Sequence, residues 1–211
     1  MPTFDEVLAS PTAAYDEGLA FFRGQGMLNT TLRRIVADLE RHGIDYAVIG
    51  AVALNQNGYR HFTEDVALLL TREGLRKFRD EFVGKGYLPA FSGATRMFKT
   101  APENVRVEIV TAGEYPGDGR PKPVVFPDPA AATEEIDGVK TLPLAKLVEL
   151  KLASGLTAPD RLKDLADVQE LIKVKGLPED FAASLDASVR DKFRELHRGV
   201  ALAKLRQREG T

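Results

Sequence analysis

The chain contains no cysteine among its 211 residues. Disulfide bonds, thiol nucleophiles and zinc–thiolate centres are therefore excluded. An excess of charge of one sign is also missing, because charged residues make up 28% of the chain while the formal net charge is only −2. No bulk electric field therefore favours nucleic acid or a membrane surface, and a polyanion would have to bind at a local patch.

Long apolar segments are absent as well. No apolar run approaches the roughly 20 residues of a transmembrane helix, and the N-terminal sequence MPTFDEVLAS lacks the basic and apolar regions of a signal peptide. We therefore expect a cytoplasmic protein with no membrane partner. The length is sufficient for a substantial hydrophobic core, in one domain or in a domain with a helical extension.

The segment 50–70, GAVALNQNGYRHFTEDVALLL, carries most of the recognisable chemistry. Residues 45–50 predict a buried strand that ends at Gly50, where a backbone without a side chain would let a phosphate approach closely. Residues 51–57 predict about two turns of helix. The first N–H groups of that helix, at Gly50 and Ala51, would face an anion.

Residues 63–70 alternate in the manner of a strand, with Thr63, Asp65 and Ala67 on one side and Leu68 among those that face the core. A carboxylate on a strand that begins beside a phosphate-binding helix is a natural metal ligand for nucleotide chemistry. The segment therefore predicts a site for a nucleotide and a divalent cation.

This run resembles the signature of the DNA polymerase β-like nucleotidyltransferases, in which a Gly-Gly or Gly-Ser pair opens a helix and a strand then carries Asp-x-Asp. Gly50 and Ala51 are similar to the pair, and Asp65-Val66-Ala67 is similar to the strand motif, with Ala67 in place of the second aspartate. The resemblance implies an α/β (α+β) fold with a small mixed, twisted sheet flanked by helices and followed by a C-terminal helical bundle. It also implies transfer of a nucleoside monophosphate from a nucleoside triphosphate, with Mg2+ or Mn2+ as cofactor.

The same resemblance assigns roles to individual residues. Asp65 and the residue at position 67 would bridge the metal ions, and Glu108 would be the third carboxylate. The alternative for Glu108, which lies in the alternating run VRVEIV, is a solvent-facing pair with Arg106 on an edge strand. The residues that would hold the nucleotide are Gly50, Ala51, Arg60, Thr63 and Lys151.

The C-terminal part of the chain contributes Lys151 and Asp164. Lys151 lies seven residues after Leu144 on the apolar stripe of a predicted helix, so it is not simply solvated. LxxLKLASG followed by RLKDLADVQEL is similar to the abortive-infection-type (AbiEii-like) toxins, in which a lysine and an aspartate on the next helix complete the active site. Asp167 is expected to lie further toward solvent and ranks below Asp164. The alternative is a partly buried ion pair between Lys151 and Asp164 that joins two helices.

Ala67 admits three explanations, because a methyl group cannot ligate a metal ion. The chain can be an engineered inactive variant, a natural pseudoenzyme, or an enzyme in which another carboxylate such as Glu64 substitutes. Glu64 is expected on the opposite face of the strand, and the rest of the signature is intact. We therefore favour an Asp→Ala change in a chain whose parent is active.

The organisation of the chain is predicted as follows. Residues 1–142 would form the nucleotidyltransferase core with an N-terminal helical arm, and residues 143–211 a helical region that completes the active site. A helix is expected from Asn29 or Thr30, both good N-caps. The final helix has an apolar seam that would pack on the helical region or form a homodimer contact.

Several functions follow from these features. The principal hypothesis is a toxin- or defence-type nucleotidyltransferase that acts on the 3′ end of tRNA and has a cognate antitoxin as partner. The alternatives are a non-catalytic nucleotide-binding or toxin–antitoxin interaction protein, and an enzyme that nucleotidylates an antibiotic or a protein.

Overall fold

The computed structural model describes residues 2–209. It divides into two compact units, of which the first contains the chain up to Ala53, Arg60–Ala112 and Pro127–Leu142. The second contains Leu54–Tyr59, Gly113–Phe126 and the chain from Pro143 onward. The predicted division at residue 142 stays a prediction, and its outer limits, Met1 and Thr211, lie outside the described residues.

Within the described residues, the first unit holds a seven-stranded sheet in the order β3-β4-β5-β2-β1-β7-β6. Strands β2 and β5 are parallel, as are β1 and β7, and the other neighbours are antiparallel. The predicted fold class, a mixed sheet flanked by helices, is confirmed. The strands are β1 (Tyr46–Ile49), β2 (Asp65–Leu70), β3 (Tyr87–Pro89), β4 (Met97–Thr100), β5 (Arg106–Thr111), β6 (Glu134–Ile136) and β7 (Val139–Thr141).

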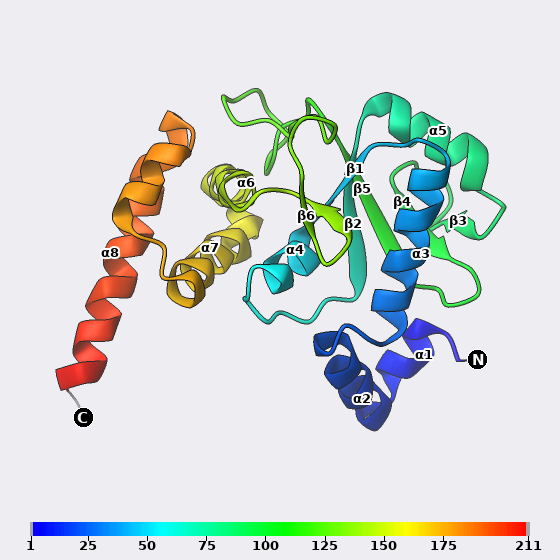
Figure 1. The fold of residues 1–211 in the computed structure, drawn as a ribbon, viewed down its shortest axis with the longest axis horizontal. Helices are drawn as coiled ribbons and strands as arrows, with labels where there is room; N and C mark the ends of the chain where they lie inside the picture. Colours follow the sequence, from blue (N-terminus) through cyan, green and yellow to red (C-terminus); the bar gives the residue numbers. More distant parts are fainter. Residues whose placement is uncertain (1, 210–211) are drawn as a thin grey trace. The chain divides into compact units, whose positions relative to one another are not determined.

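One face of this sheet is covered by helices whose apolar side chains form the core (Figure 1). Val66, Leu68 and Leu70 of β2 point into it and pack with helical side chains such as Ile35 and Phe78. The alternation predicted for this strand therefore holds on the core side. The helices of the first unit are α1 (Phe4–Ala9), α2 (Pro11–Phe22), α3 (Met27–Arg41) and α5 (Arg72–Phe82), together with the start of α4 (Gly50–Gln56).

The start of α3 differs from the prediction. The helix begins at Met27 instead of after Asn29 or Thr30, and its N-cap, Gly26, has no side chain to offer. The carboxylate of Glu17 on α2 takes that place by accepting from the N–H of Met27 at 2.8 Å. A cap supplied by another helix satisfies the same unpaired N–H groups as a local cap, but leaves no local sequence signal.

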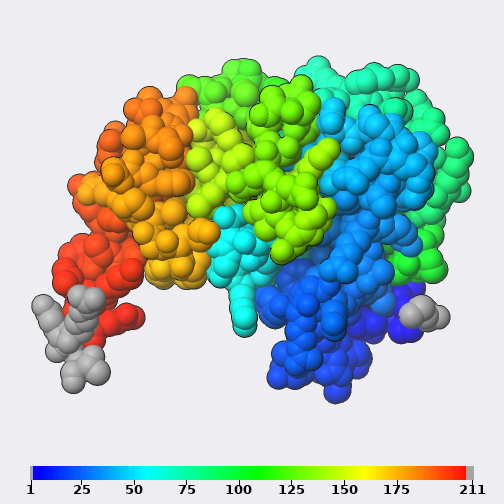
Figure 2. Space-filling view, in the orientation of Figure 1, coloured from blue at the N-terminus to red at the C-terminus, as the bar shows by residue number. Residues whose placement is uncertain are grey.

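The second unit is helical. Its elements are α6 (Leu144–Thr157), the 3₁₀ turn η1 (Pro159–Arg161), α7 (Leu162–Lys175), the 3₁₀ turn η2 (Glu179–Ser184) and α8 (Ala187–Glu209), with the end of α4. Leu162, at which α7 begins after the 3₁₀ turn, is 66% exposed. Residues 201–207 of α8 are all exposed, and Figure 2 shows this end of the helix in red. The homodimer contact expected of α8 stays a prediction.

Segment 113–126 belongs to the second unit and closes on itself. Gly113 N–H donates to the Phe126 carbonyl at 2.8 Å, and Phe126 N–H donates to the Glu114 carbonyl at 2.9 Å. The segment is therefore a loop with a fixed base. Among the helices described, none is both long and apolar enough to cross a lipid bilayer.

Candidate active site

The sheet face opposite the core carries the acidic residues singled out by the sequence. In the parallel pair of β2 and β5, Asp65 is the partner of Arg106 and Ala67 is the partner of Glu108. Residues paired in this way point to the same side of a sheet. Asp65, Ala67 and Glu108 therefore share one face, on which Asp65 and Ala67 are half-buried and Glu108 is exposed.

Thr63, just before β2, holds the Asp65 carboxylate. Its hydroxyl donates to Asp65 Oδ1 at 2.5 Å, and Thr63 itself is only 9% exposed. A buried donor of this kind fixes the rotamer of the acid and leaves Oδ2 as the oxygen to present to a ligand. The nucleotide contact predicted for Thr63 stays a prediction, while its hydrogen bond makes it the residue that orients Asp65.

Gly50, the first residue of α4, lies against Ala67. Its φ of 66° is in the left-handed region, and a Cβ placed on it would lie 3.2 Å from the Ala67 Cβ. A side chain at position 50 would need both a strained backbone and a displaced residue 67. Ala51 is half-buried and Arg60 is exposed. The nucleotide-binding roles of Gly50, Ala51 and Arg60 stay predictions.

Replacing Gly50 with alanine is expected to destabilise the first unit more than the same change at Gly43. The left-handed backbone costs roughly 1–2 kcal/mol at either position, and contact with Ala67 adds roughly 1–3 kcal/mol at Gly50 alone. Gly43 is the matched control, because its φ is 60° and nothing lies within 4 Å of an added Cβ. Urea unfolding of the two variants measures the difference, and equal losses would remove the Ala67 contact from the explanation.

Arg106 does not form the pair with Glu108 that was the alternative from sequence. Its guanidinium donates to Glu64 Oε2 at 3.2 Å, with both side chains about half exposed to solvent. Exposed pairs of this kind contribute little to stability, about 0–1 kcal/mol. Glu64 is thus engaged with Arg106 at the start of β2, which leaves Asp65 on β2 and Glu108 on β5 as the two acids on this face.

The residues present do not fit a two-metal site. Within residues 2–209, no three His, Cys, Asp or Glu side chains come together in a way that could hold a metal ion. Asp65 and Glu108 supply the hard oxygen ligands that Mg2+ prefers. Ala67, the register partner of Glu108, offers only a methyl group. The disagreement lies at the one position where the sequence departs from the Asp-x-Asp pattern.

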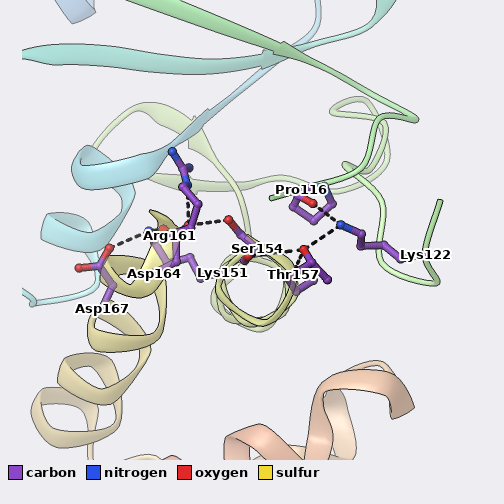
Figure 3. A network of polar contacts seen from close by, with 9 residues as sticks. Pro116, Lys122, Lys151, Ser154, Thr157, Arg161, Asp164 and Asp167 are labelled. Carbon is purple, nitrogen blue, oxygen red and sulfur yellow. Dashed lines mark hydrogen bonds and ion pairs between the residues drawn. The ribbon is translucent and has the colours of Figure 1, made fainter. Parts of the chain in front are cut away.

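A second group of residues, the Lys151 cluster, lies within the second unit (Figure 3). It consists of Lys151 and Ser154 on α6, Arg161 at the end of η1, and Asp164 and Asp167 on α7. Lys151 Nζ donates to Asp164 Oδ1 at 2.9 Å and to Asp167 Oδ2 at 2.8 Å. Asp164 Oδ2 accepts from Ser154 Oγ at 2.6 Å and from Arg161 Nε at 3.1 Å.

The expectation that Asp167 lies further toward solvent than Asp164 is wrong. The Asp167 side chain is 3% exposed and the Asp164 side chain 11% exposed, so Asp167 is the more deeply buried. Asp164 and Asp167 lie three residues apart, which puts both on one helix face. That spacing is the sequence signal for the shared face, although the apolar residues of α7 taken alone place Asp167 toward solvent. Ser154, three residues after Lys151 on α6, is a further member of the cluster that was not among the predicted site residues.

The electrostatics of the cluster follow from its geometry. Burial by itself raises the pKa of Asp164, but the Lys151 ammonium and the hydrogen bond from Ser154 outweigh burial and hold that pKa below its ordinary value. Burial, followed by the negative charges of Asp167 and Glu170, raises the pKa of Tyr59. The phenol of Tyr59 therefore stays neutral within the field of the cluster.

The polar network continues from the Lys151 cluster to segment 113–126 (Figure 3). Lys122 Nζ donates to Thr157 Oγ1 of α6 at 2.9 Å, and to the Pro116 carbonyl and the Asp118 carboxylate within its own segment. A Cβ on Gly117 would lie 2.8 Å from the Ser154 carbonyl, so the loop is packed directly on α6. The segment is therefore held onto the helix that carries Lys151.

No protein-family model matches the chain, and no curated protein matches it. Several solved structures are similar. ANT(2″)-Ia in complex with adenylyl-2″-tobramycin has a TM-score of 0.49 at 13% identity, over 79% of this chain and 96% of that one. JHP933 from Helicobacter pylori has a TM-score of 0.45 at 15% identity, over 87% and 94%.

An antigenic nucleotidyltransferase-like protein from Paracoccidioides brasiliensis has a TM-score of 0.44 at 17% identity, over 69% of this chain and 75% of that one. At this level of similarity these structures carry no argument about what this chain does.

Proposed function

We infer that this chain has the framework of a metal-dependent nucleotidyltransferase and that Ala67 makes it inactive as it stands. The observation that supports this proposal is the register of β2 and β5. It sets residue 67 beside Glu108 and two residues after Asp65, on one face of the sheet. An aspartate at this position would bring three carboxylates together, the ligand type that Mg2+ and Mn2+ prefer.

Three residues have proposed roles that do not involve contact with a metal ion. Thr63 fixes Asp65, Gly50 leaves room beside residue 67, and the Lys151 ammonium is the cation for the triphosphate. Only with an aspartate at position 67 would the chain hold a divalent cation, which would supply charge stabilisation for in-line displacement at the α-phosphorus of a nucleoside triphosphate. The proposed acceptor is the 3′ end of tRNA, as in the toxin branch that the Lys151 and Asp164 segments resemble.

The Ala67→Asp variant tests the proposal. With each labelled nucleoside triphosphate, Mg2+ or Mn2+ and total cellular RNA, it is expected to transfer label, whereas the unchanged chain is not. Ala67→Asn is the matched control, because it has the shape of aspartate without the charge and is expected to stay inactive. Acceptor pools of protein and aminoglycoside, run in parallel, identify the acceptor class.

A non-catalytic nucleotide-binding protein is the second candidate, and the lack of a three-acid group in the described residues favours it. The two candidates differ in one result. If the folded Ala67→Asp variant binds nucleotide but transfers nothing to any of the three pools, the chain is a nucleotide-binding module and the enzyme proposal is lost.

A further inference from the structure

A row of register partners crosses the sheet from β2 to β3, on the face that carries Asp65. The row consists of Asp65, Arg106, Lys99 and Leu88, one residue from each of β2, β5, β4 and β3. Partners in register point to the same side of a sheet, so all four lie on the face opposite the core. These strands are neighbours at one end of the sheet, where β3 is the last strand.

The outer part of this face is apolar and open. Leu88 is 52% exposed, and Met97 of β4, the register partner of Glu108, is 40% exposed. Phe91, which begins the turn between β3 and β4, is 59% exposed. We name Leu88, Phe91 and Met97 the β3–β4 shelf. The hairpin that carries them is held from its other side, where Phe98 packs into the core.

Two cations lie on the same face between the shelf and Asp65. Lys99 pairs with Asp5 at 3.4 Å, and Arg106 pairs with Glu64 at 3.2 Å. Solvent-accessible pairs of this kind contribute only about 0–1 kcal/mol, so a phosphate can replace either carboxylate at low cost. Exposed apolar and aromatic side chains beside cations are the combination with which proteins bind single-stranded nucleic acid, through base stacking and backbone contacts.

The proposed chemistry gives the direction from which an acceptor reaches this face. Gly50 follows β1, which lies on one side of β2, whereas β5, β4 and β3 lie on the other side. In-line displacement puts the leaving and attacking oxygens on opposite sides of the phosphorus. With the triphosphate beside Gly50, the acceptor hydroxyl therefore comes from the side of Glu108 and the shelf. Neighbouring strands lie roughly 4.8 Å apart, so a base over Met97 is close to a sugar hydroxyl over Glu108.

We propose that the β3–β4 shelf binds the terminal base of a single-stranded RNA end, while Lys99 and Arg106 contact its phosphates. This rests on the proposed function, because it takes the acceptor hydroxyl to approach from the side of the shelf. The shelf disfavours an aminoglycoside, whose positive charges the two cations repel and whose hydroxyl groups find no partner on apolar side chains. A tyrosine of a protein acceptor is flat, as a base is, but brings no phosphate for the two cations.

The experiment is methyl NMR of the unaltered chain, labelled with 13C at its methionine methyl groups, of which there are only three. The Met97 signal is assigned by its loss in Met97→Leu. It is expected to move upfield on saturation with a short RNA that ends in an unpaired adenosine, because the ring current of a stacked base shifts nearby nuclei. The same signal is expected to stay in place with tobramycin and with a tyrosine-containing peptide.

The affinity for the same RNA provides a second measurement. Phe91→Ala is expected to raise Kd by about tenfold, the size of one lost stack between a base and an aromatic ring. Phe22→Ala is the matched control, expected to leave Kd unchanged, because Phe22 is also exposed but lies on α2, which packs into the core through Phe21. Lys99→Gln is expected to reduce the slope of log K against log salt by about 0.7, as for one lost phosphate contact to a single strand.

Three results would overturn the proposal: no binding of the RNA, binding that leaves the Met97 signal in place, or an unchanged Kd in folded Phe91→Ala. A Met97 signal that moves with tobramycin or the peptide but not with RNA would also overturn it, and would assign the shelf to another class of acceptor. Loss of the proposed function gives a different result. In that case the folded Ala67→Asp variant transfers no label, while its Met97 signal still moves with RNA.

Discussion

The Ala67→Asp variant is expected to bind Mn2+ tightly where the unaltered chain binds it weakly or not at all. Neighbouring strands lie roughly 4.8 Å apart, and alternate residues of one strand roughly 6.6–6.8 Å apart. A carboxylate at position 67 would thus lie between Asp65 and Glu108 at spacings that one hard cation can bridge. Mn2+ is the probe because its electron paramagnetic resonance signal reports the free ion directly.

Stability provides a second view of the same site. Without metal, a third acid beside two others is expected to lower stability by roughly 0.2–1 kcal/mol, as for like charges on facing strands. With Mn2+ at about 100 times its Kd, binding to the folded state is expected to add about 2.7 kcal/mol. Thermal unfolding with Mn2+ and with EDTA measures both effects.

Ala67→Asn separates charge from shape in these measurements. It adds the same volume next to Gly50, so any loss through crowding appears in both variants. Because it adds no charge, Ala67→Asn is expected to show neither the loss of stability from charge repulsion without metal nor the gain of stability with Mn2+. Equal Mn2+ binding by the aspartate and asparagine variants would mean that residue 67 is not part of a metal site.

The sheet could be predicted from the sequence because its information is local. The alternation of acid and aliphatic residues around Asp65 and Glu108, and the Asp137-Gly138 turn between β6 and β7, each specify a strand or hairpin on their own. Alternation alone does not say which strands are neighbours, so the parallel pairing of β2 with β5 comes from the structure.

What could not be predicted depends on groups that are distant in the sequence. Glu17 caps α3 from the preceding helix, so the helix begins earlier than Asn29 or Thr30 would indicate. Asp167 is buried because α6 brings Lys151 to it. The apolar stripe of α7 alone predicts that Asp167 is exposed to solvent. The ammonium of Lys151 on α6 compensates its charge, and this allows the aspartate to be buried.

Replacing Lys151 with methionine is expected to lower the stability of the second unit by roughly 3–5 kcal/mol, because it leaves buried carboxylates without their cation. For a protein of this size that corresponds to a fall in Tm of about 6–20 °C. Lys122→Met is the matched control. The two lysine side chains are similarly buried, with 11% exposure for Lys122 and 12% for Lys151. Their acidic partners differ, because the Asp118 side chain beside Lys122 is 28% exposed. The side chains of Asp164 and Asp167 beside Lys151 are only 11% and 3% exposed. Water can solvate Asp118 once its partner is gone, so Lys122→Met is expected to lose less.

The loss in Lys151→Met is expected to depend on pH in a definite direction. In the unaltered chain the pKa of Asp164 is below its ordinary value. Its contribution is therefore complete above the unfolded pKa of about 3.9 and disappears as the pH falls through the folded pKa. In Lys151→Met the effect of burial is no longer outweighed by the ammonium, so protonation relieves the destabilisation. Urea unfolding should show a smaller gap between the two proteins at pH 4.5 than at pH 7.

A variant that neutralises the whole group distinguishes unpaired charge from lost packing. Lys151→Met combined with Asp164→Asn and Asp167→Asn removes the ammonium and both carboxylates together, and is expected to recover much of the stability lost in Lys151→Met. A gap that is the same at both pH values, together with no recovery in the triple variant, would mean that the lysine stabilises the unit through its aliphatic stem. A gap that narrows with falling pH, together with recovery, means that charge compensation by Lys151 is what allows α7 to bury two aspartates.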